Sequence, residues 1–315
     1  MRVASVALLL VAACAQPPRT EAAPAPEPEA VAPAVEAATV ALPGPAALVA
    51  FREDSRFEQA GLAFGRTLPG ARVVMDDVSV PVDAEGRFVL GFGQFAEAQA
   101  TLRVTLPDGG EVAQALAVAP REFEFGGVID VPASQVSQFS EADLEHIRRS
   151  TAAKTAARAR PSPDDALWSV GFGWPAEGYV TSRFGKFRRY PNGDVVRPHS
   201  GVDVAAPRAP GGGPAFDYTG AEVVSPSAGV VTLAEPDMFF EGGLVLIDHG
   251  QGLESALLHL SEVDVAAGDA VARGQRIGGA GSTGRSTGPH VHWSLKWHGR
   301  LVDPEALVPP MEDAR

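Results

Sequence analysis

Two shortages in the sequence narrow what this chain can be. Its 315 residues include a single cysteine, Cys14, which therefore has no disulfide partner within the chain. Basic residues are also outnumbered, because 26 Lys and Arg face 39 Asp and Glu, for a formal net charge of −13. A nucleic-acid-binding protein needs a basic face to meet phosphate groups. The composition therefore argues against nucleic acid as a partner.

Long apolar runs are scarce as well, and the most apolar one lies at the N-terminus. Residues 1–13 are too short to span a bilayer as a permanent helix and are typical of a secretory signal. The small residues before Cys14 resemble the bacterial lipobox, which implies that Cys14 is lipidated and becomes the first mature residue. A plain signal peptide with an incidental cysteine is the alternative. Because Ala15 follows in place of aspartate, resemblance to Gram-negative sorting rules favours an outer-membrane anchor facing the periplasm.

Residues 14–45 are dominated by Ala, Pro and Glu. Such a segment cannot bury a core, and its prolines keep the chain extended. We expect it to be a tether that lets the rest of the protein reach away from the membrane.

The first folded region is expected over residues 46–121. Short apolar alternations are separated by turn signals there, including a hairpin signal at residues 107–110. This spacing predicts a small antiparallel β-sandwich of immunoglobulin-like type. The region has no His, Asp or Glu cluster with metal-ligand spacing. We expect it to space or position the rest of the chain, or to dock a partner protein or glycan.

Residues 122–169 are predicted to be a connector that contains one linking helix. Ser140 is a helix N-cap candidate, with Asp143 three residues later as in a capping box. Leu144, Ile147 and Thr151 share one face at helical spacing, and the helix is expected to run into the Ala-rich stretch before Pro161.

Residues 170–310 carry many short β runs punctuated by glycine and almost no helical periodicity. This pattern predicts an all-β domain with a sizeable core, and the chain as a whole is predicted to be mainly β.

The histidines of this domain stand at positions that could support metal chemistry. His290 and His292 are two residues apart on a predicted strand, so both rings point to one face. His199 precedes Asp203 by four residues, and His259 ends another predicted strand. Zinc binds imidazole and carboxylate groups, and a catalytic zinc site uses three protein ligands. Spacing alone does not show that these residues converge.

The order of these motifs resembles the lysostaphin/LytM family of zinc endopeptidases over about residues 174–308. The matching segments are His199-x-x-x-Asp203, His259-Leu260-Ser261 and residues 284–293. The resemblance implies one zinc ion per chain, bound by His199, Asp203 and His292, with His259 and His290 as catalytic residues that do not bind the metal. Which of the two catalytic histidines is the general base stays open.

The resemblance also implies a function: a zinc-dependent endopeptidase that hydrolyses peptide cross-links between the stem peptides of peptidoglycan. The alternative is a catalytically silent LytM-type regulator that activates cell-wall amidases, and the intact set of five site residues favours the enzyme. Residues 207–220 form a longer loop than is usual in this family, and we expect this loop to border the substrate groove.

Overall fold

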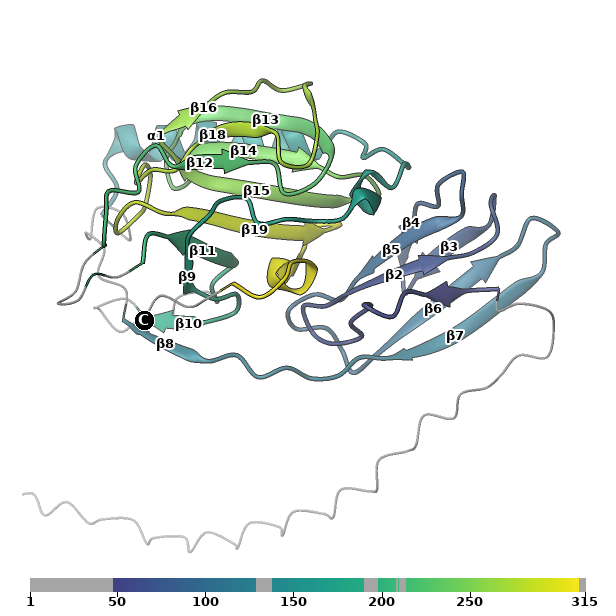
Figure 1. Ribbon diagram of the computed structural model, residues 1–315. Coiled ribbons are helices and arrows are strands. Elements are labelled where there is room, and N and C mark those ends of the chain that lie inside the picture. Colours follow the sequence, from purple (N-terminus) through teal and green to yellow (C-terminus); the bar gives the residue numbers. More distant parts are fainter. Residues whose placement is uncertain (1–47, 129–137, 190–197, 208, 210–213, 312–315) are drawn as a thin grey trace, which may run out of the picture. The chain divides into compact units, whose positions relative to one another are not determined.

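The computed structural model describes residues 48–128, 138–189, 198–207, 209 and 214–311 (Figure 1). In this part of the chain the structure is mainly β with one α-helix, as predicted. The predicted signal segment and tether, residues 1–45, lie outside the described residues, and Cys14 lies there with them. No described helix combines the length and the apolar character that crossing a bilayer requires.

Two small antiparallel sheets form the N-terminal part of the described chain. The first has the strand order β1-β2-β5, and the second has the order β4-β3-β6-β7. Strand β6 buries every second side chain, which is the two-residue period expected of a half-buried strand. The predicted hairpin at residues 107–110 joins β6 to β7. An immunoglobulin-like topology stays a prediction. The strand bounds are β1 Ala50–Phe51, β2 Leu62–Arg66, β3 Arg72–Met75, β4 Val78–Val80, β5 Arg87–Gly91, β6 Gln99–Thr105 and β7 Glu111–Ala117.

Helix α1 (Glu141–Arg158) begins as the sequence predicts. The Ser140 Oγ accepts from the Asp143 backbone N–H, and the Asp143 carboxylate accepts from the Ser140 backbone N–H at 2.8 Å. These two bonds form a reciprocal capping box, which satisfies two N–H groups that the helix cannot bond internally.

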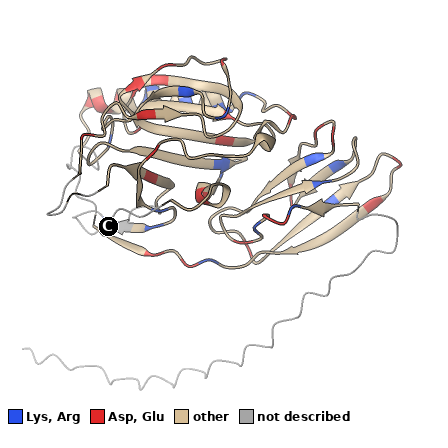
Figure 2. Ribbon diagram, viewed as in Figure 1, with Lys and Arg blue, Asp and Glu red and all other residues tan. Residues whose placement is uncertain are grey.

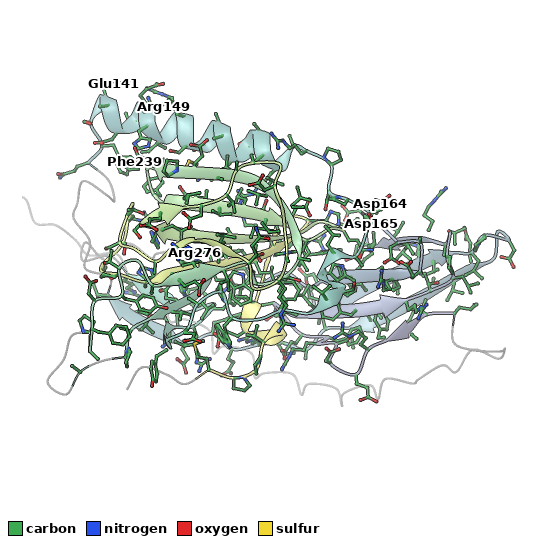
Figure 3. All side chains as sticks on the ribbon, turned by 45° about the horizontal axis from the view of Figure 1, so that its top comes forward. Glu141, Arg149, Asp164, Asp165, Phe239 and Arg276 are labelled. Carbon is green, nitrogen blue, oxygen red and sulfur yellow. The ribbon has the colours of Figure 1, made fainter. Side chains whose placement is uncertain are left out.

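The face that α1 buries is made of small side chains. Leu144 is 37% exposed, whereas Ser150 and Ala157 are the buried residues of the helix. The small side chain of Ala157 packs against apolar residues of the large C-terminal sheet, among them Met238 and Leu244. The helix therefore covers part of that sheet and is more than a linker; in Figure 3 it runs along the sheet with Phe239 beneath it. The His146 and Phe239 rings are 5.5 Å apart there.

A large antiparallel sheet organises the C-terminal part of the described chain. Its order is β17-β13-β14-β15-β19-β11-β9, and β20 pairs with β19. A three-stranded sheet, β12-β18-β16, lies with it, and β8 pairs with β10 in parallel. The bounds are β8 Phe125–Val128, β9 Tyr179–Ser182, β10 Phe187–Arg189, β11 Gly201–Ala205, β12 Glu222–Val224, β13 Gly229–Met238, β14 Gly242–Asp248, β15 Leu253–Leu260, β16 Glu262–Val263, β17 Ala270–Val271, β18 Arg276–Gly279, β19 Val291–Trp297 and β20 Arg300–Val302, with short 3-10 helices η2 Leu167–Val170 and η3 Pro304–Leu307.

The two faces of strand β19 have different surroundings: one faces the apolar core, and the other lines a groove. Trp293, Leu295 and Trp297 alternate along the strand and are fully buried in the main apolar cluster. His292 and Ser294 lie between them and line a groove on the other face. The alternation of the strand thus turns the polar residues away from the core.

Candidate metal centre

Pairing between two strands brings three sequence-predicted residues together. Asp203 on β11 lies directly opposite His292 on β19 in the antiparallel register. His199 stands just before β11. Gly201, the first residue of β11, lets β11 and β19 approach each other closely. A Cβ atom on Gly201 would lie 2.1 Å from the backbone oxygen of Trp293, so only glycine fits there.

The ligand-capable atoms of these three residues form a compact group. His199 Nε2 lies 3.1 Å from Asp203 Oδ1 and 3.1 Å from His292 Nδ1, and His292 Nδ1 lies 2.8 Å from Asp203 Oδ1. Three ligands of a tetrahedral zinc ion, each about 2.0–2.2 Å from the metal, stand roughly 3.3–3.6 Å apart. The observed triangle is close to that size.

Backbone contacts fix the orientation of the His199 ring. Its Nδ1 donates to the carbonyl oxygen of Arg183 at 2.9 Å, so Nε2 presents a lone pair to the Asp203 carboxylate. Two lone pairs at 3.1 Å repel each other unless a proton or a metal cation lies between them. Histidines that bind a metal through one ring nitrogen commonly donate the N–H of the other nitrogen to a carbonyl oxygen, as His199 Nδ1 does here. The donor set of two imidazoles and one carboxylate therefore fits zinc.

Electrostatics keep Asp203 in the form that a metal needs. Burial opposes ionisation of its carboxyl, but His199, His292 and His290 outweigh burial and hold the pKa of Asp203 well below 3.8. Burial lowers the pKa of His292, although its hydrogen bond to Asp203 works in the opposite direction. An ionised carboxylate and a neutral imidazole are the protonation states that bind zinc.

The other two predicted residues, His259 and His290, lie beside this triangle. Their ring centroids are 4.8 Å apart, and His290 Nε2 is 3.7 Å from Asp203 Oδ1. His290 Nδ1 donates to the Gly288 carbonyl at 2.8 Å, and His259 Nδ1 donates to the Thr283 carbonyl at 2.9 Å. In both rings Nε2 is therefore the nitrogen that carries a lone pair.

His259 is held by its backbone as well as by its ring. Its φ of 65° lies in the left-handed region, which is uncommon for a residue with a side chain. Its backbone N–H donates to the Glu241 carbonyl at 2.8 Å, which stabilises this conformation. Burial, followed by the nearby His290 and His292, lowers the pKa of His259 to about 3. His259 is therefore neutral at neutral pH.

Comparison with known proteins places this site in a family. The model of peptidase family M23 matches residues 197–304, which include all five histidine and aspartate residues of the site. Residues 197–304 form an M23 peptidase domain. The large sheet with the site at β11 and β19 is thus the LytM-like fold that the motifs imply.

The sequence relatives of the M23 domain carry peptidase names. The chain is 37% identical over 132 residues to the peptidoglycan DD-endopeptidase ShyA of Vibrio cholerae, covering 42% of this chain and 28% of that protein. It is 36% identical over 131 residues to the DD-carboxypeptidase/endopeptidase Mpg of Neisseria meningitidis, covering 42% and 27%. The chain thus spans about a quarter of the length of these relatives.

One solved structure extends the likeness beyond the M23 domain. A crystal structure from Pseudomonas aeruginosa that carries the name peptidase M23 is 28% identical, with a TM-score of 0.57. The similarity covers 80% of this chain and 95% of that one, so it reaches into the N-terminal sheets.

The M23 domain holds its site in a groove of about 690 Å³. Sequence reasoning missed several residues that line it. Gln94 and Phe95 come from the N-terminal part and Lys154 and Arg158 from α1, whereas Lys296 lies on β19 itself, four residues after His292. The prediction that loop 207–220 borders the groove was wrong for its described residues. Tyr218 is buried in the core and donates to the Glu177 carbonyl, and the glycines at 211–213 lie outside the described residues.

Proposed function

We propose that this protein is a zinc-dependent endopeptidase that hydrolyses peptide cross-links of peptidoglycan. The observation that carries the proposal is the convergence of His199, Asp203 and His292 on one point, with two further histidines beside it. The names of the sequence relatives support peptidoglycan as the substrate. The M23 family is zinc-dependent, and zinc, when bound, supplies Lewis-acid activation of water and of the scissile carbonyl.

The residues divide into metal holders and proton carriers. His199, Asp203 and His292 would hold the ion through Nε2, Oδ1 and Nδ1. His259 and His290 each offer an unprotonated Nε2, so either can take the proton of the attacking water and later give it to the leaving amine. The other ring, once protonated, can donate to the developing oxyanion.

Three variants test this division. His290→Ala should keep stoichiometric zinc but lose about 10²–10⁴ in the rate of cross-linked muropeptide cleavage, because one proton-transfer group is gone. His292→Ala should lose both zinc and cleavage. His146→Ala is the matched control, since that ring bonds to the Asp237 carbonyl outside the groove. Zinc content and product masses are measured on the same purified proteins.

The outcomes of this experiment separate the enzyme from the silent regulator. Wild-type protein that binds zinc and releases no cleavage products would reject the enzyme and favour the regulator. If His290→Ala lost zinc while His292→Ala kept it, the two roles would have to be exchanged.

We also propose that Cys14 carries a lipid anchor at the outer membrane, facing the periplasm. The support is the lipobox-like sequence before Cys14, followed by Ala15. Two or more acyl chains give stable membrane attachment. Cys14→Ser should therefore release the mature chain from the membrane fraction. A variant that still pellets with membranes after a high-salt wash would reject the anchor.

A further inference from the structure

The groove continues along strand β19 away from the metal centre and reaches a lysine. His292, Ser294 and Lys296 alternate on the groove face of the strand, and all three line the groove. At about 3.3 Å per residue, the Cα of Lys296 lies about 13 Å from that of His292. An extended peptide lying along β19 would pass Lys296 three to four residues from the metal centre.

The acidic residues near Lys296 are committed to other cations. Glu254 is its cross-strand neighbour on β15, and its carboxylate binds Arg158 of α1 at 2.8 Å. Glu241 forms an ion pair with Lys154 of the same helix. Each of the two carboxylates is thus paired with a cation of the helix, and neither forms an ion pair with Lys296. Figure 2 shows that α1 and the strands of the large sheet carry residues of both signs.

Lys296 itself forms no ion pair with any residue that the structure describes. Burial, followed by repulsion from Arg158, lowers the pKa of its ammonium group, although the nearby Glu254 and Glu241 carboxylates work in the opposite direction. A half-buried cation that lacks a counter-ion in an otherwise acidic protein is a site where an anionic ligand group is stabilised.

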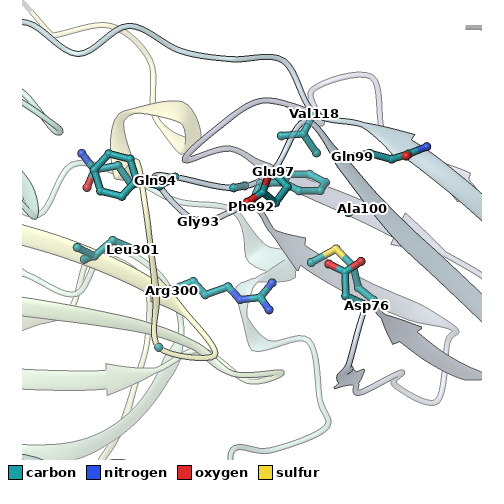
Figure 4. Close-up of a pocket in the computed structure, with 14 residues that line it drawn as sticks. Asp76, Phe92, Gly93, Gln94, Glu97, Gln99, Ala100, Val118, Arg300 and Leu301 are labelled. Carbon is teal, nitrogen blue, oxygen red and sulfur yellow. The ribbon is translucent and has the colours of Figure 1, made fainter.

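Besides Lys296, a second hydrogen-bond donor at the same end of the groove, the amide of Gln94, has no acceptor among the described residues. Gln94 is only 5% exposed and lines the groove, and its amide Nε2 has no hydrogen-bond partner among the described residues. Leu301, the β20 partner of Lys296, lines the groove together with Gln94. Gln94 and Leu301 also line an adjoining cavity of about 590 Å³. Figure 4 shows both residues at one end of this cavity, away from Asp76 and Gln99. Buried donors are normally satisfied, so Gln94 indicates a ligand acceptor.

We propose that this end of the groove is a carboxylate-binding subsite, in which Lys296 and Gln94 hold an acidic residue of the peptide substrate. The acidic residue lies three to four extended residues from the bond that is cleaved. The subsite rests on the proposed endopeptidase function, which it refines: the enzyme selects anionic peptides. The N-terminal part of the chain, through Gln94, contributes directly to substrate selection.

The test compares matched peptides that differ only in charge. A series of cross-linked peptides carries a single carboxylate at successive positions from the scissile bond, and each peptide has a twin with a carboxamide in its place. Wild-type protein should prefer the carboxylate at one position by roughly 10- to 100-fold in kcat/KM, the range of a charge-assisted hydrogen bond. The preference should appear mainly in KM, because the subsite is remote from the reacting bond.

Lys296→Met keeps the apolar stem and removes the charge, so it should abolish this preference: the kcat/KM of the carboxylate peptide should fall to that of its carboxamide twin measured with the same variant. Lys296→Arg should retain part of the preference, and Gln94→Leu should reduce it. Arg103→Met is the control with the same change in net charge, because Arg103 is exposed on β6 and does not line the groove. Equal losses on both peptide twins in Lys296→Met, or no loss on either, would overturn the subsite.

A binding measurement separates the subsite from the proposed activity. Calorimetric titration of the same peptide pairs into His290→Ala and into His290→Ala/Lys296→Met reports charge selection without turnover. Selective binding that depends on Lys296, together with wild-type protein that cleaves nothing, would reject the activity and keep the subsite. Cleavage by wild-type protein without charge selection in either assay would reject the subsite and keep the activity.

Discussion

At the scale of single residues, His249 shows how this fold uses a histidine for structure. Its side chain is completely buried; Nδ1 donates to the Ala228 carbonyl at 2.7 Å, and Nε2 accepts from the Ser255 hydroxyl at 2.8 Å. Burial lowers the pKa of His249 to about 4 from its ordinary 6.5, although the bond to Ala228 opposes the shift. The ring is therefore neutral in the folded protein, and protonation must disrupt its contacts.

His249 should make the free energy of unfolding fall as the pH is lowered. Because the folded pKa is below the unfolded one, the unfolded chain takes up the proton first. The contribution of neutral His249 to the free energy of unfolding is complete above about pH 6.5 and is lost as the pH falls toward 4. At pH 5 the loss amounts to about 2 kcal/mol. His249→Gln should be less stable at neutral pH but show a smaller drop between about pH 7.5 and about pH 5. Urea unfolding with a chelator present measures this difference, and equal drops in both proteins would contradict it.

The histidines also show what residue spacing can predict and what it cannot. The shared face of His290 and His292 follows from a two-residue period, so sequence alone predicts it. The meeting of Asp203 with His292 depends on the register of β11 against β19, which spacing does not contain. Lys296 was missed even though the same period places it on the face of His292. The signal was present, but a lysine on a strand is most often solvated.

At the scale of elements, the approach of β11 to β19 sets the geometry of the centre. Gly201→Ala would place a methyl group 2.1 Å from the Trp293 carbonyl oxygen and 2.9 Å from His292 Nε2. The strands must separate, which moves Asp203 away from His292. We expect zinc affinity to fall at least about 10-fold, as it does when the support of a metal ligand is disturbed.

Gly288→Ala is the matched control for this variant. No atom lies within 4 Å of the added Cβ, and the backbone there is not left-handed. It should therefore bind zinc like the wild type, although it lies only two residues before His290. The measurement is zinc affinity by chelator competition on folded protein. Wild-type affinity in Gly201→Ala would show that the strand spacing can relax without cost.

Helix α1 illustrates which features of an element are local. Its start follows from Ser140 and Asp143, which bond to each other across three residues, so sequence predicts it. The face that the helix buries cannot be predicted from the spacing of its large apolar residues. The helix buries Ala157, and small side chains give a weak periodic signal. Its cations Lys154 and Arg158 then reach the groove, a role that no local pattern in the sequence could reveal.

At the scale of the whole described molecule, the N-terminal sheets share one apolar cluster with the C-terminal part of the chain, which includes the M23 domain. Phe64 of β2 packs against Trp168 with ring centroids 4.8 Å apart, and Gly91 lies against Trp297. Gln251 donates to the Arg87 carbonyl at 2.9 Å. Contacts of this kind couple the folding of the two regions, since neither buries its full core alone.

An ion pair provides the sharpest test of that coupling. Arg121 follows the N-terminal sheets, and its guanidinium lies 2.6 Å from the carboxylate of Asp303, whose side chain is 4% exposed. The Asp303 backbone N–H also donates to the Ala60 carbonyl at 2.8 Å. Arg121→Met would leave a buried carboxylate without its cation. Because the arginine is partly exposed, we expect a loss of roughly 1–3 kcal/mol in the free energy of unfolding.

Fluorescence reads this loss in the C-terminal part of the chain, because all four tryptophans follow residue 167 and two of them, Trp293 and Trp297, lie in the M23 domain. A variant on the N-terminal side should therefore shift the urea midpoint reported by tryptophans, and circular dichroism should give the same midpoint if the two regions unfold together. Adding Asp303→Asn should recover part of the loss by removing the unpaired charge. An unchanged tryptophan midpoint in Arg121→Met, or two separate transitions in the wild type, would show that the regions fold independently.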